Sequence, residues 1–590
     1  MKNDIPGFES VERPSLSCDA PGAWRFETSR AVAPDGAEIL RVRLAADEPA
    51  PPPRFDVAFV APQPGVRWIW TSAADVPTLP PEWGGKMRTQ IATQSPLVVL
   101  AGGDGRARLS VACSEATRFV DWRFGLYEED GLVHVRLGFF PEPEAPLSAY
   151  EAEIRLDAAP ADWADAVRAA SDWICARPGY EPMPVPDAAF DPLYSTWYGY
   201  HQDVHDKDLE REFAEAAALG MKTLIVDDGW QTEDTGRGYA FCGDWEPAPS
   251  RFPDFRAHVD RVHALGMKYM IWYSVPFVGV KSRAAERFAG KFLYSRENMG
   301  AWVLDPRFPE VREFLASTYE RAVCDWNLDG LKLDFIDSFL APNPDPAAAE
   351  NYAGRDIRSV PEAVLALMTE VRRRLEAVRP GILVEFRQGY MGPAIRSFGN
   401  MIRAGDVPGD PLRNRARTAR LRLTSGTTAV HSDMLEWNPR ETPQQAAQQI
   451  LSVLFSVIQY SMRLDRLPAD HKRMMRHWIA WTTAHRDALL RGDFRPRSPE
   501  LGYPLLEGAS AAERVLAVYE PGLAVSVPAD REAWVVNATD DPVLLLDLAA
   551  APASAEAFDV FGDPVAVAAP AAGLQRAAVP PSGLLRLRFA

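Results

Sequence analysis

The stretch "DGLKLDFIDSF", residues 329–339, places charged side chains inside a segment with the composition of a buried strand. Leucine, isoleucine and phenylalanine supply its apolar groups, whereas Lys332, Asp334 and Asp337 interrupt them. A charge inside a core segment lowers stability unless it is paired or takes part in chemistry. The pattern therefore raises the question of what a lysine and two aspartates do on this strand.

Outward from this stretch, short apolar runs alternate with amphipathic helical patterns. "KTLIVDDGW" (222–230) has the composition of a strand, and "KDLEREFAEAAALG" (207–220) before it has a helical stripe that ends at glycine. Repeated strand–helix units predict a parallel sheet with right-handed crossovers. About seven to eight units within about 300 residues favour an α/β fold with a closed (β/α)8 TIM-like barrel. A doubly wound open sheet is the alternative, although no glycine-rich phosphate loop follows any of these strands.

Both flanks of this region have a β-rich pattern. The N-terminal flank contains short alternating runs separated by Gly, Pro and Asp turns, and it ends in a proline-rich linker. Short strand patterns return after about residue 500. We therefore expect an N-terminal β-sandwich at 1–185, a catalytic (β/α)8 barrel at 190–495 and a small C-terminal β-sandwich at 500–590.

Composition narrows the classes of partner and compartment. The 590 residues carry a formal net charge of 64 − 81 = −17, which argues against nucleic acid or an anionic membrane as a partner. The five cysteines are scattered without a C-x-x-C pair, so neither a disulfide framework nor a zinc site is indicated. No signal-peptide pattern opens the chain, and no run approaches the ~18 apolar residues of a membrane span. We expect a soluble cytoplasmic protein with no metal or cofactor, and the sequence leaves homo-oligomer formation open.

Carboxylates follow one predicted strand after another. The carboxyl ends of barrel strands form the functional face, so polar residues there are candidates for a site. One buried carboxylate is usually structural, but carboxylates at five strand ends of one barrel predict an enzyme site. The carboxylates are Asp227, Asp228, Asp334, Glu385, Asp406 and Asp433, and the aromatic side chains near them include Trp197, Trp230, Trp245 and Trp272.

Several carboxylates with aromatic walls and few histidines suit a sugar substrate. Glycoside cleavage uses two carboxyl groups, one as nucleophile or base and the other as acid. Asp334 suits the nucleophile, and Lys332 lies two residues earlier on the same strand face, where its charge would keep a carboxylate ionised. Asp406 ends a later strand and suits the proton donor. A plain buried ion pair is the alternative interpretation of the lysine and the aspartate.

Five motifs resemble, in their order, the signature of the α-galactosidase (melibiase) and raffinose-synthase family of retaining glycosidases. The motifs are "LIVDDGWQ" (224–231), "CGDW" (242–245), "FPDF" (252–255), "DGLKLDF" (329–335) and "IRAGD" (402–406). The resemblance implies that Asp334 is the nucleophile. It also implies that Asp406, three residues after Arg403, is the acid/base, with Asp410 close enough to compete for that role.

The resemblance implies further contacts to the sugar. Asp227 and Asp228 would bind its outer hydroxyls, and Lys332, Cys242 and Trp245 would add contacts. A tryptophan loop from the N-terminal domain often covers the barrel in this family, and Trp83 of "PPEWGGKM" is its counterpart here. The chain departs from the melibiases at "VEFRQGYMGPAIRSFGN" (384–400), where they carry a cysteine and glycines, so Glu385, Arg387 and Gln388 would replace the usual contacts.

Three alternatives compete with a retaining glycoside hydrolase. A metal-dependent barrel hydrolase would use His201 and His205 of "HQDVH", but a strand-to-helix turn does not bring two such rings together. A non-catalytic sugar-binding protein could dispense with one reactive carboxylate, and a galactosyl transferase of the raffinose-synthase type would form the same covalent intermediate. We expect a retaining exo-acting α-glycosidase, in the first place an α-galactosidase, acting on an oligosaccharide or other glycoside.

Overall fold

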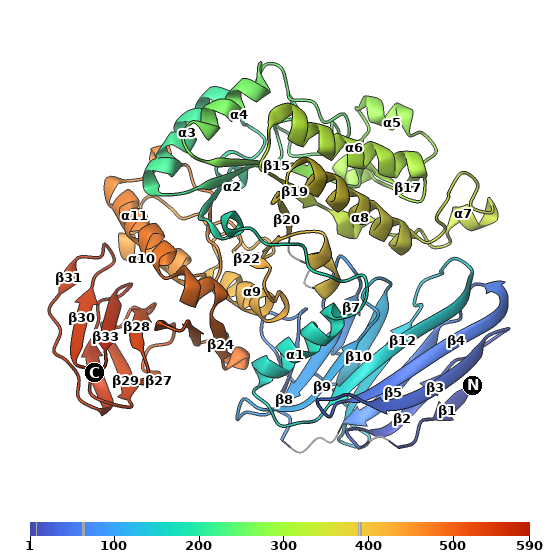
Figure 1. Ribbon diagram of the computed structural model, residues 1–590, viewed down its shortest axis with the longest axis horizontal. Helices are drawn as coiled ribbons and strands as arrows, with labels where there is room; N and C mark the ends of the chain where they lie inside the picture. Colours follow the sequence, from blue (N-terminus) through green and yellow to red (C-terminus); the bar gives the residue numbers. More distant parts are fainter. Residues whose placement is uncertain (8, 62–64, 388, 390–391) are drawn as a thin grey trace.

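The computed structural model describes residues 1–7, 9–61, 65–387, 389 and 392–590. Its strands form three groups that follow one another along the chain: antiparallel sheets at the N-terminus, a parallel barrel, and further sheets at the C-terminus (Figure 1). In Figure 1 the barrel forms the upper part of the molecule, and the two β-rich groups lie below it on opposite sides. The domain boundaries inferred from the sequence stay predictions.

Two six-stranded antiparallel sheets form the N-terminal group, and apolar side chains from both pack between them. The helix α1 (Trp163–Cys175) follows, capped by Asp162, and packs on β8, β9 and the barrel helix α9 (Pro411–Thr424). The first sheet contains β1 (Lys2–Asp4), β2 (Glu12–Ser17), β5 (Phe55–Ala61), β11 (Val133–Phe139), β10 (Val120–Leu126) and β7 (Lys86–Thr89). The second contains β3 (Arg25–Val32), β4 (Glu38–Ala50), β12 (Leu147–Asp157), β9 (Ala107–Cys113), β8 (Leu97–Ala101) and β6 (Trp68–Thr71).

The central group is an eight-stranded parallel sheet that closes on itself. A parallel bridge between His431 and Val457 joins its two ends, and the Val457 N–H donates to the Val430 carbonyl at 2.8 Å. This confirms the α/β fold class and the (β/α)8 TIM-like barrel. In spatial order the strands are β22 (Ala429–His431), β21 (Met401–Arg403), β20 (Leu383–Arg387), β19 (Gly330–Asp334), β15 (Lys268–Ser274), β14 (Thr223–Val226), β13 (Leu193–Ser195) and β23 (Gln459–Tyr460).

Helices cover the outside of the barrel, and an antiparallel excursion follows β15. The helices include α3 (Asp206–Leu219), α4 (Phe255–His263), α6 (Pro309–Trp326), α8 (Val360–Val378), α10 (Pro443–Leu451) and α11 (Ala469–Ala484), together with α9. The excursion comprises β16 (Phe277–Gly279), α5 (Arg283–Arg287), β17 (Phe292–Arg296) and β18 (Ala301–Leu304). Between β20 and β21 the structure has the short 3₁₀ helix η4 (Pro393–Ser397).

The barrel interior changes from apolar to polar along the strands. An apolar layer fills its amino-terminal end, formed by Leu193, Ile225, Met270, Leu383, Met401, Ala429 and Val457. Two residues further along, the register aligns Trp272, Lys332 and Glu385 on neighbouring strands. Side chains two apart share a face, so the polar groups of the sequence pattern project into the barrel above an apolar floor.

The C-terminal group contains a seven-stranded and a three-stranded sheet around a small apolar core. The larger sheet is formed by β24 (Asp493–Arg497), β25 (Leu505–Ala509), β26 (Glu513–Val518), β28 (Glu532–Asn537), β33 (Leu584–Arg588), β30 (Ser554–Phe558) and β31 (Pro564–Val565). The smaller sheet is formed by β27 (Ala524–Val527), β29 (Val543–Leu548) and β32 (Gly573–Ala578). Within the described residues, no helix is both long enough and apolar enough to cross a membrane.

Candidate active site

Asp334 ends strand β19 with its carboxylate held from three directions. The Trp272 indole N–H donates to Oδ2 at 2.9 Å, and the Phe335 backbone N–H donates to Oδ1 at 2.8 Å. The Arg387 guanidinium, from the end of β20, forms an ion pair with Oδ1 and lies 4.4 Å from the centre of the Phe335 ring. Phe335 adopts a left-handed backbone conformation with φ of 65°, which is costly for a bulky residue and is characteristic of functional sites. The surroundings therefore fix one rotamer of Asp334.

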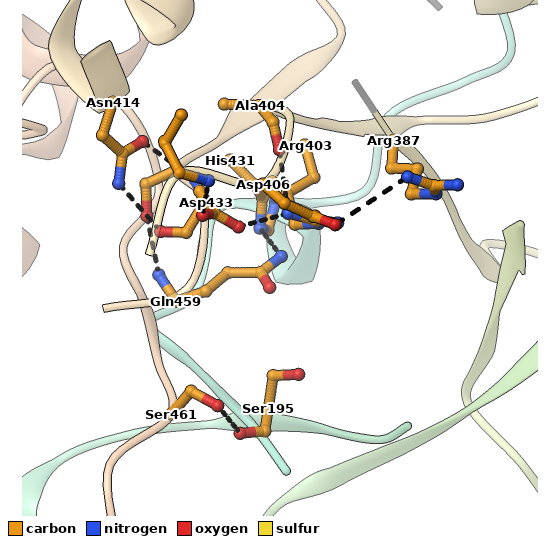
Figure 2. Close-up of polar contacts among 12 residues, drawn as sticks. Ser195, Arg387, Arg403, Ala404, Asp406, Asn414, His431, Asp433, Gln459 and Ser461 are labelled. Atoms are coloured by element: carbon orange, nitrogen blue, oxygen red, sulfur yellow. Dashed lines mark hydrogen bonds and ion pairs between the residues drawn. The ribbon is translucent and has the colours of Figure 1, made fainter. Parts of the chain in front are cut away.

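Asp406 follows strand β21 and lies beside the same arginine. Arg403, which is fully buried, donates to Asp406 Oδ1 at 2.8 Å, and Arg387 Nη1 lies 4.0 Å from Oδ2 (Figure 2). The Asp406 side chain is 47% exposed, whereas Asp334 is only 5% exposed. Arg387 thus contacts both carboxylates that the sequence selected as reactive.

The two arginines control the charge of Asp406. Partial burial would raise the pKa of the Asp406 carboxyl, but the positive charges of Arg403 and Arg387 outweigh it and hold that pKa well below its usual range. In the unliganded protein Asp406 is therefore ionised at neutral pH.

Asp433 is completely buried, and protein donors occupy both of its carboxylate oxygens. Arg403 forms an ion pair with Oδ1 (Figure 2). The Tyr198 hydroxyl and the Val407 N–H donate to Oδ2 at 2.9 and 2.6 Å. Its own backbone is fixed through the Asn414 side-chain amide at 3.0 and 3.1 Å. Burial raises the pKa of Asp433 to about 6. These contacts assign Asp433 to the orientation of Arg403 and of the loop that carries Asp406.

Asp433→Asn is expected to lower kcat by about 10–100-fold, the usual effect of removing a group that orients an active-site residue. The isosteric amide cancels one of the two charges that Arg403 binds, so the guanidinium would interact more strongly with Asp406, lower its pKa further and leave less of it protonated to donate to the leaving group. The loss should consequently be larger for a glycoside with a poor leaving group than for a nitrophenyl glycoside, and KM should change little. Steady-state kinetics on such a pair of substrates measures this difference.

The matched control is Asp410→Asn. Asp410 caps helix α9 through the Arg413 N–H at 3.0 Å, so its replacement should lower the melting temperature slightly and leave the leaving-group dependence unchanged. An equal loss on both substrates in Asp433→Asn would contradict the positioning role.

Asp227 and Asp228 end strand β14 with buried carboxylates. Lys332 Nζ donates to Asp227 Oδ2 at 2.6 Å, so the lysine of the opening motif pairs across the barrel with β14. The side-chain amides of Gln202 and Gln231 donate to the two oxygens of Asp228, each at 2.7 Å. Burial raises the pKa of Asp228 to about 7. Both carboxylates and the lysine are thus oriented before any ligand enters.

Glu385 lies in the polar layer beneath these groups. It is fully buried, and its Oε2 accepts a hydrogen bond from Gln459. Its Oε1 has no hydrogen-bond partner within the part of the chain that the structure describes. Burial raises the pKa of Glu385 to about 7, against the opposing charges of Lys332 and Arg403. The protonated and ionised forms are therefore both populated at neutral pH.

The aromatic residues divide into site and core. Trp272 contacts Asp334 through its indole N–H, whereas Trp230 stacks on Trp245 at 6.1 Å and is wholly buried. Trp230 also packs on Trp326, on the helix side of the barrel wall, at 5.6 Å. Trp197 is half-buried, with the Arg237 guanidinium over its ring at 5.6 Å. Of the four tryptophans predicted near the carboxylates, Trp197 is the one that is not buried, whereas Trp272 acts on the site through its hydrogen bond to Asp334.

The remaining candidates lie at the edge of the site. Cys242 is buried, accepts weakly from Gln231 at 3.8 Å, and has a pKa raised by burial. Trp83 is 65% exposed in the loop between β6 and β7, whose backbone pairs with Leu126 of the sandwich. Gln388 lies outside the described residues.

The Ser72–Asp75 segment of the N-terminal group contacts the barrel at helix α9. Asp75 pairs with Arg413, Arg417 and Arg420 of helix α9, and Arg420 also donates to the Ser72 carbonyl at 2.8 Å. The histidines of "HQDVH" do not meet: the ring of His201 packs edge-on against Trp197, and His205 pairs with Asp203.

The site residues that the sequence did not predict are mostly amide and hydroxyl partners. Tyr198 lies in the short helix α2 (Trp197–Tyr200), Gln202 in the turn that follows it and Gln459 in the short strand β23, and none of them stands in a motif that indicated its role. Gln231 directly follows "DDGW" and could have been selected from the motif.

The fold and the site together define a (β/α)8-barrel protein with paired carboxylates at its strand ends. Residues 189–385 match the family model described as Melibiase. This barrel segment is thus similar in sequence to the melibiase family, as the motifs indicated.

Curated relatives with sequence similarity to this chain bear the name alpha-galactosidase. The Probable alpha-galactosidase G of Emericella nidulans is 31% identical over 175 residues, covering 27% of this chain and 24% of that protein. The Alpha-galactosidase C of the same organism is 29% identical over 140 residues, covering 21% of this chain and 19% of that protein. The matched segment thus spans about a quarter or less of the length of these curated relatives.

The likeness to solved structures extends over the whole chain but is one of fold alone. The GH36 alpha-galactosidase AgaA of Geobacillus stearothermophilus has a TM-score of 0.62 at 14% identity, with 100% of this chain and 87% of that chain covered. The alpha-galactosidase of Lactobacillus brevis has a TM-score of 0.61 at 14% identity with the same coverage of 100% and 87%. Variants of AgaA have been solved in complex with stachyose and with raffinose.

Proposed function

We propose that the protein is a retaining, exo-acting α-glycosidase that hydrolyses terminal α-linked galactose. The observation that carries this proposal is the pair Asp334 and Asp406, which end two strands of a melibiase-family barrel and share one arginine. Relatives bear the name alpha-galactosidase, and the complexes of AgaA variants with raffinose and stachyose support oligosaccharides as the substrate class.

In the first step, the Asp334 carboxylate attacks the anomeric carbon while the bond to the aglycone oxygen breaks. Trp272 and Arg387 hold the carboxylate in one orientation, which lowers the cost of reaching the transition state. Asp406 gives its proton to the departing oxygen, and a galactosyl ester of Asp334 is left.

In the second step, Asp406, now ionised, takes a proton from water. The water oxygen bonds to the anomeric carbon, the ester bond breaks, and Asp334 returns to its ionised state. In the unliganded protein the low pKa of Asp406 suits a charged carboxylate beside Arg403. The first step needs Asp406 in its protonated form, so it requires that the bound sugar displaces part of the positive charge of the arginines.

Asp227, Asp228 and Lys332 are the proposed contacts to the sugar hydroxyls. The two carboxylates accept hydrogen bonds from hydroxyl groups, and the ammonium donates one. Because Gln202 and Gln231 already fix Asp228, little conformational entropy is lost when the sugar binds.

The choice of Asp406 over Asp410 as the acid/base is supported by the surroundings of each. Asp406 is half exposed and flanked by Arg387 and Arg403, next to Asp334. The carboxylate of Asp410 is used to cap helix α9.

A panel of nitrophenyl α-glycosides tests the proposal. The galactoside should be turned over at least about 100-fold faster, in kcat/KM, than the glucoside, which differs only at C4, because buried carboxylates left without their hydroxyl partner destabilise the complex. The pentoside that lacks C6 and the matching β-galactoside serve as controls. Proton NMR of the first product should detect α-galactose. Initial formation of β-galactose, or no turnover of any α-glycoside, would contradict the proposal.

A further inference from the structure

A cavity of about 360 Å³ lies between the N-terminal sandwich and helix α9. The sandwich contributes the Ser72–Asp75 segment and Gln94, and the barrel contributes Ala404 and Gly405 together with one face of α9. Ala404 and Gly405 immediately precede Asp406, and Arg417 Nη1 donates to the Asp406 carbonyl at 3.3 Å. The cavity is therefore continuous with the segment that carries the proposed acid/base.

Three arginines of one helix face line this cavity. Arg413, Arg417 and Arg420 are spaced four and three residues apart, so they lie on one side of α9. Like charges at this spacing repel one another, and Arg413, in the first turn of α9, is further disfavoured by the helix dipole. Such an arrangement requires negative charge in front of it.

The protein supplies only part of that negative charge. Asp75 accepts from Arg413 at 3.0 Å and from Arg417 at 3.3 Å, and it also forms an ion pair with Arg420. Asp337 also lines the cavity. The described lining thus contains three arginines and two aspartates, which leaves a surplus of one positive charge. Burial accordingly lowers the pKa of Arg420 despite its contact with Asp75.

Two buried polar atoms of the lining lack partners. Arg420 is only 4% exposed, and among the described residues its Nε has no hydrogen-bond partner. Gln94 Oε1 is also buried and has no hydrogen-bond partner among these residues. Buried polar groups in native proteins are nearly always satisfied, so this pair indicates a place for a polar ligand. Among the described lining residues there is no aromatic ring on which the apolar face of a neutral sugar could stack.

We propose that this cavity is the aglycone subsite and that it binds an aglycone carrying an anionic group, such as a phosphate, carboxylate or sulfate. The inference rests on the proposed function, because the aglycone departs on the side of the acid/base. Guanidinium groups bind such oxyanions through paired, charge-assisted hydrogen bonds. Arg413 and Arg417 provide the accessible donors.

The experiment compares two α-galactosides whose aglycones, glycerol and glycerol phosphate, differ by one phosphate group. The wild-type protein should hydrolyse the phosphate with about tenfold or higher kcat/KM, since a charge-assisted pair contributes about this factor. Arg413→Gln should lower the ratio of the two kcat/KM values about tenfold, and Arg417→Gln provides a second variant on the same face. Arg373→Gln is the matched control, because that arginine is exposed on helix α8 and pairs with Glu370.

Calorimetric binding of glycerol phosphate separates this inference from the proposed function. Binding by the wild-type protein that is weakened in Arg413→Gln supports the anion site even if no galactoside is hydrolysed, in which case the proposed function fails alone. Equal kcat/KM values for the two galactosides in the wild-type protein, or a ratio that Arg413→Gln leaves unchanged, would overturn the inference. So would glycerol phosphate binding no more tightly than glycerol.

Discussion

Asp334→Ala is expected to lower kcat on nitrophenyl α-galactoside by ~10⁴-fold or more, because the substitution removes the atom that forms the covalent intermediate. The effect on KM should be smaller, since Asp227, Asp228 and Lys332 still bind the hydroxyls. Single-turnover and steady-state kinetics on highly purified protein measure the loss. The residual rate must be shown not to come from contaminating wild-type enzyme.

Azide identifies the missing group in the same variant. With alanine at position 334, azide can enter the space of the carboxylate and attack the anomeric carbon from the β face, which yields β-galactosyl azide directly from the α-galactoside. Asp334→Asn is the isosteric control: it keeps an acceptor for Trp272 and leaves no room for azide, so it should be inactive and not rescued. Turnover above about 1% of wild type in Asp334→Ala would exclude Asp334 as the nucleophile.

The fold could be predicted because each element is encoded locally. Alternation of strand and helix periods implied parallel crossovers, and polar residues that end apolar strands implied the functional end of a barrel. The polar layer of Trp272, Lys332 and Glu385 was visible for the same reason: a period of two places these side chains on the inner face of consecutive strands.

Pairings across the barrel could not be predicted in this way. Lys332 shares a strand face with Asp334, yet its ammonium reaches Asp227 on β14, a partner brought close only by closure of the sheet. Trp230 belongs to the motif "DDGW", but its ring packs against Trp326 at the end of helix α6, outside the barrel. Strand register fixes which face a side chain takes, whereas its partner depends on the neighbours that the closed barrel supplies.

The contribution of the N-terminal sandwich was equally hidden. Trp83 was selected because the resembling family often extends a tryptophan loop from the N-terminal domain over the barrel, and in the structure it is exposed beside the sandwich. Asp75, in a turn without a recognised motif, makes ion pairs with the barrel. Its three arginine partners are 338 to 345 residues away in sequence, and only the docking of the two units brings them together.

Asp406→Ala is expected to lower kcat/KM by about 10²- to 10⁴-fold on an α-galactoside with a sugar aglycone, and far less for the first step on a dinitrophenyl galactoside. A poor leaving group requires the proton that Asp406 gives, whereas dinitrophenolate departs without it. Release of the galactosyl ester also needs Asp406 as a base, so the intermediate should accumulate on the activated substrate and give a burst of dinitrophenolate. Azide should relieve this accumulation by attack from the α face, and the product should be α-galactosyl azide.

The pH dependence gives Asp406 a second signature. Since Arg403 and Arg387 hold the pKa of Asp406 well below its usual range, the protonated form in the unliganded protein becomes scarcer as pH rises from that pKa. For the sugar-aglycone substrate, kcat/KM of the wild-type protein should therefore increase as pH is lowered from neutrality. For the dinitrophenyl galactoside this increase should be absent. Asp406→Ala should abolish the increase with the sugar-aglycone substrate, whereas Asp410→Asn should retain the wild-type profile; the opposite assignment of the two profiles would transfer the acid/base role to Asp410.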